Sequence, residues 1–237
     1  MNKTEVAAGF DGVAEHYDRL VSMNPGYLKH LSLSAQRLAL PTTPADGSVR
    51  ILDLCCGTGL STAALRRVYP NAEIVGLDAS AEMLRVAAGR LAGDGTTFVA
   101  GDATDPRASG ITGEFHGVLM AYGIRNIPQP DLCLSHIRAL LAPSGRACFH
   151  EYALPDSRWQ RAKWAAVSSA IIVPLSKVVA GDTTLFRYLR DSVWDFDGPG
   201  EFQSRLKRAG FGEVQMLAMT GWQRGLVHSF VAQRGAS

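Results

Sequence analysis

The chain has 237 residues, of which 46% are hydrophobic and 19% are charged, and its formal net charge is +2. This composition predicts a globular protein with a sizeable core and excludes intrinsic disorder. The small net charge argues against nucleic acid as a partner. The four cysteines, Cys55, Cys56, Cys133 and Cys148, form no C-x-x-C pair, so we expect neither a metal site nor a redox motif.

Nothing in the sequence indicates export or a membrane span. Residues 1–5 lack the apolar stretch of a secretory signal. The longest apolar run, Trp164–Ser176, contains Pro174 and is too short to cross a bilayer. We therefore expect a cytoplasmic protein.

The first part of the chain is helical and the next part alternates. Phe10–Leu40 has helical apolar spacing with a turn at Asn24–Gly26, and Pro41–Gly47 reads as a linker. From Val49 onward, buried strands alternate with helices, which is typical of a parallel sheet covered on both faces. The expected strands are Val49–Leu54, Glu73–Leu77, Thr97–Ala100, Gly117–Ala121 and Arg146–Glu151, and the expected helices are Ser61–Tyr69, Ala81–Leu91 and Leu132–Leu141.

After Pro155 the alternation stops. Two apolar helical segments, Trp159–Ala180 and Thr184–Val193, indicate an insert at the carboxyl edge of the sheet. A last helix and two strands follow, at Pro199–Ala209, Glu213–Met219 and Leu226–Ala232. The fold class is therefore α/β: a Rossmann-like open sheet of parallel strands with a final antiparallel pair. We expect one domain over 1–237, made of an N-terminal helical cap (1–47), a cofactor-binding core (48–155), a helical substrate lid (156–197) and a C-terminal helix with strands (198–237).

The strongest functional signal is the run Leu52–Gly59, where a buried strand enters a glycine turn. Asp78 ends the next strand, close to the ~20-residue separation expected of an acid that binds ribose hydroxyls. Asp102 ends the third strand, where it can accept a hydrogen bond from an adenine amine. Asp53, inside the run, would repel a pyrophosphate, so a cationic nucleoside such as S-adenosylmethionine fits better.

Three alternatives are weighed against this interpretation. A nicotinamide dehydrogenase needs a third small residue after the glycines, and position 62 is Thr. A phosphate-binding P-loop is excluded because no Gly-Lys-Ser/Thr follows. A non-catalytic binding protein on the same fold would have little reason to keep the glycines and all three acids.

The chain resembles the class I S-adenosylmethionine-dependent methyltransferases and, more narrowly, the ubiquinone/menaquinone-biosynthesis C-methyltransferases. Four segments carry the resemblance: Phe10–Asp18, Leu52–Gly59, Tyr122–Asn126 and Arg187–Ser192. The chain departs from the family at Leu60, where an acid is usual, and over Met23–Tyr27, which lacks the usual Gly…Arg-x-Trp run.

The resemblance implies roles for particular residues. Those assigned to S-adenosyl-L-methionine are Tyr17, Asp53, Cys55, Gly57, Gly59, Asp78, Ala79, Met83, Asp102, Ala103 and Tyr122. Met83 could equally be a core residue. Arg125 and Asn126 are expected near the hydroxyl of the methyl acceptor, where Arg125 would stabilise an oxyanion or orient a water. The alternative for Arg125 is a salt bridge that fixes its loop.

Further candidates lie at the fifth strand and in the insert. His150 and Glu151 end that strand, and alternation sends only one of them inward, as a base or a substrate contact. The resemblance places Tyr188 in the substrate pocket.

The acceptor remains open on the sequence alone. A prenylated quinol methylated at a ring carbon is one reading, and a natural-product aromatic methylated at oxygen or carbon is the other. The apolar insert fits a lid that takes a lipid-like acceptor from a membrane surface. It also fits burial of the insert against itself or against a second copy in a homodimer.

Overall fold

The computed structural model describes residues 3–41, 48–154, 157–172 and 184–235. Seven strands form one sheet in the order β3-β2-β1-β4-β5-β7-β6. The first five strands pair in parallel, and β7 runs antiparallel between β5 and β6. The strands are β1 (Arg50–Leu54), β2 (Glu73–Asp78), β3 (Thr97–Ala100), β4 (Phe115–Ala121), β5 (Leu141–Tyr152), β6 (Phe211–Ala218) and β7 (Val227–Arg234). The predicted fold class is confirmed.

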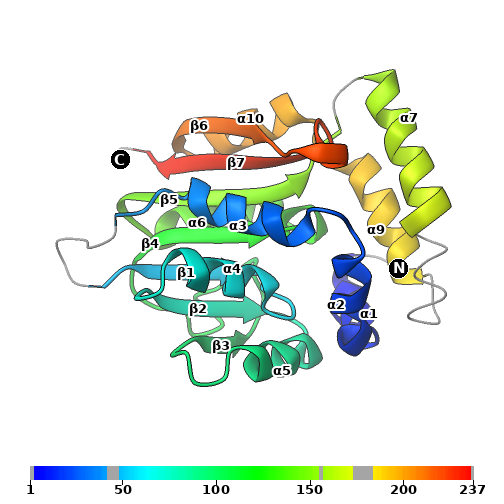
Figure 1. Ribbon diagram of the computed structural model, residues 1–237. Helices are drawn as coiled ribbons and strands as arrows, with labels where there is room; N and C mark the ends of the chain where they lie inside the picture. The colour runs from blue at the N-terminus through cyan, green and yellow to red at the C-terminus, as the bar shows by residue number, and fades with distance from the viewer. Residues whose placement is uncertain (1–2, 42–47, 155–156, 173–183, 236–237) are drawn as a thin grey trace.

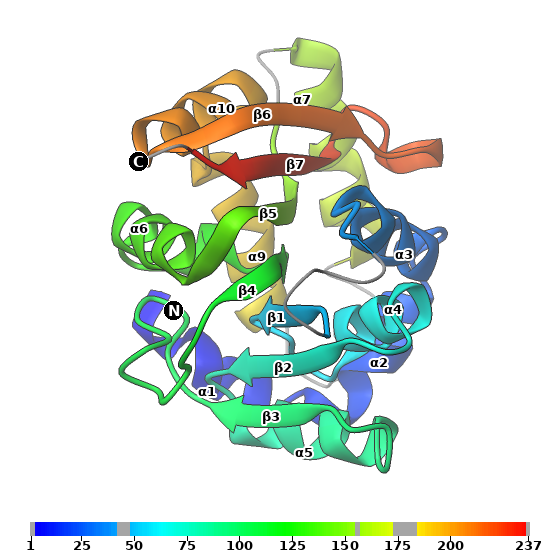
Figure 2. The same cartoon turned by 90° about the vertical axis from the view of Figure 1, so that its left-hand side faces the viewer.

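The helices cover both faces of the sheet and its carboxyl edge. Their bounds are α1 (Val6–Asp11), α2 (Ala14–Ser22), α3 (Tyr27–Arg37), α4 (Leu60–Val68), α5 (Ala81–Arg90), α6 (Pro130–Leu140), α7 (Arg158–Val167), α9 (Thr184–Asp195) and α10 (Pro199–Arg208). Figure 2 shows α3 and α4 on one face and α6 and α10 on the other. In Figure 1, α1, α2, α7 and α9 gather where the parallel strands end.

The sheet is buried on both faces, as expected for parallel strands between helices. In β1, Leu52 and Leu54 enter the core beneath α6 and α10, while Ile51 enters the core beneath α3 and α4. Asp53 alternates onto the same face as Ile51, so the only acid of this strand points toward α4. The carboxyl end of β1 is therefore supported by packed core residues on both faces of the sheet.

Many element ends shift by one to three residues from the predicted bounds, and three differences are of another kind. The N-terminal helix breaks at Gly12–Val13, which the apolar spacing did not reveal. Leu141 begins β5 instead of ending a helix, because it pairs with Phe115 of β4. The helix predicted from Trp159 is α7 followed by a π-helical turn at Ser168–Ile172, and its remaining part lies outside the described residues, as does 42–47 of the predicted linker. Within the described ranges, no helix is long and apolar enough to cross a membrane.

Candidate active site

The ends of β1 and β4 bring two unusual backbone conformations together. Cys55 (φ 56°) and Tyr122 (φ 57°) both adopt the left-handed region, which is uncommon for residues other than glycine and is often found at functional sites. Gly123 allows the two strand ends to approach, since a Cβ there would lie 2.8 Å from the Cβ and Sγ of Cys55. Gly57 (φ 54°) has no atom within 4 Å of the position a Cβ would take. The turn therefore leaves open space beside its own backbone.

A small cavity of about 40 Å³ lies at this glycine turn. Its lining residues are Tyr17, Tyr27, Leu31, Cys55, Cys56, Gly57, Thr58, Leu60, Ser61 and Ala121. Three residues predicted for the cofactor, Tyr17, Cys55 and Gly57, thus come together although Tyr17 is distant in sequence.

Asp53 lies behind the turn instead of lining the cavity. Its side chain is fully buried, and one oxygen accepts hydrogen bonds from Ser61 Oγ (2.7 Å) and Thr62 Oγ1 (2.6 Å) at the start of α4. The other oxygen has no hydrogen-bond partner in the described part of the chain. Burial raises the pKa of Asp53 to about 7. A cation bound at the turn would therefore stabilise the ionised form of this carboxyl.

The acid at the end of β2 holds the turn directly. Asp78 accepts hydrogen bonds from the backbone N–H of Gly57 (2.8 Å) and of Ser80 (2.9 Å), and burial raises its pKa. Asp102, at the end of β3, is exposed and accepts from the N–H of Thr104 (2.7 Å). The two acids thus stand at successive strand ends, with open access at Asp102.

The remaining predicted cofactor residues are placed less directly. Gly59 begins α4 with φ 80° and packs on α5, where a Cβ would lie 3.1 Å from the Cβ of Ala87. Met83 is buried in a cluster with residues of α2 and α9. Ala79 is exposed, and Ala103 is buried with its carbonyl accepting from the Cys133 thiol.

The N-terminal helices are tied onto this edge by two acids. Asp18 of α2 accepts from Thr58 Oγ1 (2.5 Å) and forms an ion pair with Arg90 of α5. Asp11 of α1 accepts from Ser80 Oγ (2.5 Å), and the backbone N–H of the same serine donates to Asp78. These contacts position Tyr17 over the glycine turn.

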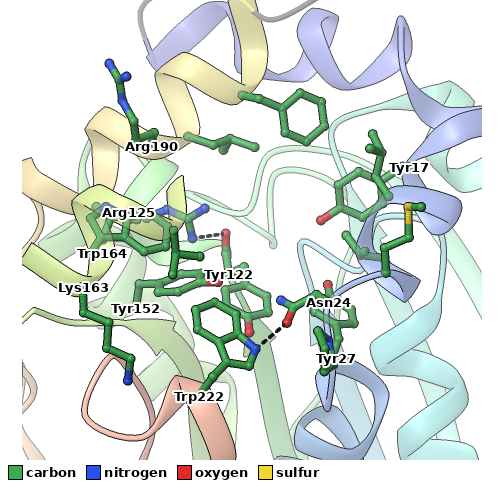
Figure 3. Close-up of a pocket in the computed structure, with 18 of the residues that line it drawn as sticks. Tyr17, Asn24, Tyr27, Tyr122, Arg125, Tyr152, Lys163, Trp164, Arg190 and Trp222 are labelled. Carbon is green, nitrogen blue, oxygen red and sulfur yellow. Dashed lines mark hydrogen bonds between the residues drawn. The ribbon is translucent and has the colours of Figure 1, made fainter. Parts of the chain in front are cut away.

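A larger cavity of about 490 Å³ adjoins the small one, and Tyr17 and Tyr27 line both. Its walls come from the N-terminal helices, the ends of β4 and β5, α7, α9 and the connection between β6 and β7 (Figure 3). The lining residues are Phe10, Tyr17, Leu20, Val21, Met23, Asn24, Pro25, Tyr27, Tyr122, Arg125, Tyr152, Lys163, Trp164, Val167, Phe186, Leu189, Arg190, Val193 and Trp222. The cavity is predominantly apolar, with a few polar groups, as is usual for small-molecule sites.

Aromatic rings form the floor of this cavity. The ring of Tyr122 stacks on Tyr27 at 5.5 Å and lies 5.3 Å from the ring of Tyr152, which in turn lies 4.8 Å from Trp164. The Tyr122 hydroxyl is buried and has no hydrogen-bond partner among the described residues. An aromatic floor with a free hydroxyl group suits a planar aromatic ligand that itself carries a hydroxyl group.

Arg125 places a buried cation at the edge of that floor. It is 6% exposed, and it donates to Glu151 Oε1 (2.5 Å), to the Tyr122 carbonyl (3.0 Å) and to Ser192 Oγ (3.2 Å). The salt bridge weighed as an alternative for Arg125 is therefore present, and Arg125 also lines the cavity. Burial raises the pKa of Glu151, and the guanidinium opposes that shift.

The other predicted catalytic and substrate residues do not line the cavity. Asn126 donates to the Tyr122 carbonyl (3.2 Å) and so braces the same turn. His150 is fully buried on the opposite face of β5, where Nδ1 lies 2.7 Å from Ser34 Oγ and burial lowers its pKa to about 3. Alternation thus sends Glu151 toward Arg125 and His150 toward α3. Tyr188 lies off the face of α9 that supplies the cavity residues.

Several lining residues were not found from the sequence. Asn24 lies in the turn between α2 and α3, Tyr27 is the first residue of α3, and Trp222 lies in the connection between β6 and β7. Trp222 Nε1 donates to Asn24 Oδ1 (3.0 Å), which joins the N-terminal cap to the end of the sheet. An aromatic residue in each of two surface connections was the available signal, but it could not indicate that the connections meet. In the parts of the chain described, no group of three or more potential ligand side chains could hold a metal ion.

Solved structures resemble this architecture. The phosphoethanolamine N-methyltransferase 2 of Haemonchus contortus, in complex with S-adenosyl-L-methionine, matches with a TM-score of 0.67 and 17% identity over 95% of this chain and 57% of that one. A putative O-methyltransferase from Nostoc punctiforme matches with a TM-score of 0.62 and 22% identity over 94% of this chain and 60% of that one. This chain thus spans less than two thirds of those structures. The sheet, the glycine turn and the acids at its edge define a class I methyltransferase fold.

The family follows from the sequence comparisons. The chain belongs to the ubiE/COQ5 methyltransferase family, whose profile matches residues 1–231, and it is a methyltransferase. It is 33% identical to a demethylmenaquinone methyltransferase of Clavibacter sepedonicus, over 91% of this chain and 86% of that protein. It is 32% identical to the ubiquinone/menaquinone biosynthesis C-methyltransferase UbiE of Syntrophotalea carbinolica, over 90% of this chain and 88% of that protein.

Proposed function

We propose that this methyltransferase moves a methyl group from S-adenosyl-L-methionine to a ring carbon of a prenylated quinol. The observation that carries the proposal is the pair of adjoining cavities that share Tyr17 and Tyr27. One lies at a glycine turn with acids nearby, and the other is apolar, aromatic and contains Arg125. A methyl donor and a methyl acceptor would therefore meet across the two tyrosines.

The residues at the glycine turn fit the cofactor. Open space at Gly57 suits the methionine part of the cofactor. The buried Asp53 carboxyl behind the turn, one oxygen of which has no hydrogen-bond partner among the described residues, would favour the positive charge of that part without contacting it. Because the small cavity holds only part of such a ligand, the ribose and adenine would lie along the strand ends that carry Asp78 and Asp102. Bound there, S-adenosyl-L-methionine supplies an activated methyl group on a sulfonium.

The chain itself contributes alignment and electrostatics. The two cavities would bring donor and acceptor together, and an in-line displacement requires that the nucleophilic carbon, the methyl carbon and the sulfur lie in one line. A quinol ring carbon becomes nucleophilic when the neighbouring hydroxyl loses its proton to solvent, and Arg125 would stabilise the resulting oxyanion. The ring carbon would take the methyl group as the carbon–sulfur bond breaks and S-adenosylhomocysteine leaves. The proton on the methylated carbon would then be lost to solvent, which restores the aromatic ring. Glu151 keeps Arg125 oriented. His150 has no role as a base in this mechanism, because its ring does not line the large cavity.

The acceptor is assigned from the cavity and from the relatives. Both curated relatives carry quinone-biosynthesis names. The apolar residues of α7 and α9, such as Val167 and Leu189, suit a prenyl tail next to the ring. In this proposal the described part of 156–197 serves as the acceptor lid. A natural-product aromatic is the second candidate, favoured by the departures at Leu60 and Met23–Tyr27.

The test is methyl transfer from radiolabelled S-adenosyl-L-methionine to short-chain demethylmenaquinol and to a panel of phenols. We expect label on a ring carbon of the quinol, and loss of that label in Arg125→Ala. Label on the phenols alone would replace the quinol with the second candidate. No label on any acceptor, with cofactor binding intact, would contradict the proposal.

A further inference from the structure

Helix α7 has an outer face that the catalytic proposal does not use. Its inner residues, including Trp164 and Val167, line the large cavity. On the outside, Trp159 is 76% exposed, which is the largest exposure among the large hydrophobic side chains of the described residues. One exposed hydrophobic side chain does not by itself mark a contact surface, so the neighbours of Trp159 on the helix decide what this face can bind.

The outer residues follow helical spacing. Trp159, Ala162, Ala166 and Ala170 recur at intervals of three and four residues, and all four are exposed. Arg158 and Arg161 flank this stripe on one side and Lys163 on the other. The sequence from 157 to 172 contains no Asp or Glu. An apolar stripe between cations is the pattern of a helix that lies in a membrane interface.

The stripe is continuous with the cavity. Lys163 belongs both to the rim of the cavity and to the flank of the stripe. Met23, on the turn after α2, is 52% exposed and also lines the cavity. In Figure 1, α7 lies at the outermost part of the carboxyl edge, separate from the sheet faces. Any partner that bound the outer face of α7 would therefore lie next to the opening of the large cavity.

We propose that the outer face of α7, formed by Arg158, Trp159, Ala162 and Ala166, docks on an anionic phospholipid bilayer. The cations attract the negative surface, and Trp159 inserts at the level of the headgroups. This inference rests on the proposed function only for its purpose, which is to let a lipid-tailed acceptor enter the cavity without crossing water. The interaction itself needs no methyl acceptor.

The experiment measures sedimentation of the full chain with vesicles of phosphatidylglycerol and phosphatidylcholine, and with phosphatidylcholine alone. We expect binding at least about tenfold tighter to the anionic vesicles, and weakening of about tenfold in Arg158→Glu and in Trp159→Ala. The matched controls, Lys207→Glu on α10 and Leu132→Ala on α6, change an exposed cation and an exposed apolar residue elsewhere. They should bind as the unmodified chain does.

Three outcomes would overturn the inference. One is equal or absent binding to both vesicle types, and another is unchanged binding in both α7 variants. The third is a dimer in solution that Trp159→Ala dissociates, which would make this face an interface between two copies. The sedimentation assay contains no methyl acceptor, so its result does not depend on whether the acceptor is a quinol. Failure of membrane binding and failure of the proposed function can therefore be told apart.

Discussion

Two regions of the site lie side by side but are constructed differently. One is the glycine-turn edge, which consists of the small cavity at Gly57 and the acids Asp53, Asp78 and Asp102 near it. The other is the large cavity. The small cavity at this edge takes most of its lining residues from the turn after β1 and the start of α4, within one short stretch of sequence. The large cavity takes single residues from the N-terminal helices, two strand ends, α7, α9 and the loop before β7. The edge is made by backbone conformation and acids, whereas the cavity is made by aromatic side chains and one buried cation.

The difference in construction predicts that the donor site and the choice of acceptor depend on different residues. The edge can stay constant because its geometry is local. The cavity depends on how distant segments pack, so replacing residues of α7 or α9 would change its walls without touching the glycine turn, whereas Tyr17 and Tyr27 belong to both regions. Variants should therefore separate into those that alter cofactor binding and those that alter the acceptor.

The largest effect is expected from Arg125→Ala. Loss of the cation should reduce methyl transfer by about 10²–10³-fold, the range seen when one oxyanion donor is removed. It also leaves Glu151 buried without its partner, which should lower the free energy of unfolding by about 3–5 kcal/mol. Labelled methyl transfer and urea unfolding measure the two effects.

Two further variants separate activity from folding. Arg125→Ala combined with Glu151→Gln should recover much of the stability but not the activity, since it removes the unpaired charge. Arg187→Ala on the exposed side of α9 should change neither. Recovery of activity in the double variant would show that Arg125 acts through folding alone.

Asp53→Asn tests the buried acid by pH. The folded-state pKa of about 7 exceeds the unfolded value of ~3.9, so the folded chain binds this proton more tightly. The stability it contributes is complete below about pH 4 and is lost as the pH rises to about 7. The variant should therefore gain stability relative to the unmodified chain across that window, by at most ~4 kcal/mol. Urea unfolding at several pH values measures the gain, and a constant difference would refute it.

Asp78→Ala should affect the edge and spare the cavity. Loss of the charged acceptor that holds Gly57, and that in our proposal also binds the ribose, should weaken cofactor binding by about 10- to 100-fold, as expected for one to two hydrogen bonds to a charged group. Calorimetric titration with S-adenosylhomocysteine measures this, with Glu201→Gln on α10 as the control. A change in acceptor KM at saturating cofactor, without a change in cofactor affinity, would reverse the assignment of the two regions.

The smallest effect is expected from Asn24→Ala. It removes the hydrogen bond to Trp222 that closes one wall of the cavity, which is worth about 1 kcal/mol. Acceptor KM should rise roughly fivefold, with cofactor affinity unchanged. Steady-state kinetics with a short-chain quinol tests this, and weaker cofactor binding would argue against the separation of the two regions.

The positions of residues at the glycine-turn edge could be predicted from the sequence better than those that line the large cavity, because the first depend on local structure and the second on long-range packing. Gly57 and Asp78 follow strands at a fixed spacing, so their positions are a local consequence of the fold. Arg125 was expected by resemblance near the hydroxyl of the acceptor; it lines the large cavity, and its role toward an acceptor stays a prediction. Trp222 and Asn24 could not be predicted, because their contact depends on how the last loop meets the N-terminal cap. The burial of His150 depends likewise on α3 packing over β5, which no spacing within β5 reveals.

The most direct test of the account is a crystal structure of the chain with S-adenosylhomocysteine and a short-chain hydroquinone. The account predicts the sulfur at the Gly57 turn, the quinol ring against Tyr122 with a hydroxyl toward Arg125, and the two ligands facing each other between Tyr17 and Tyr27. A hydroquinone bound outside the large cavity, or a cofactor that fills that cavity itself, would contradict it.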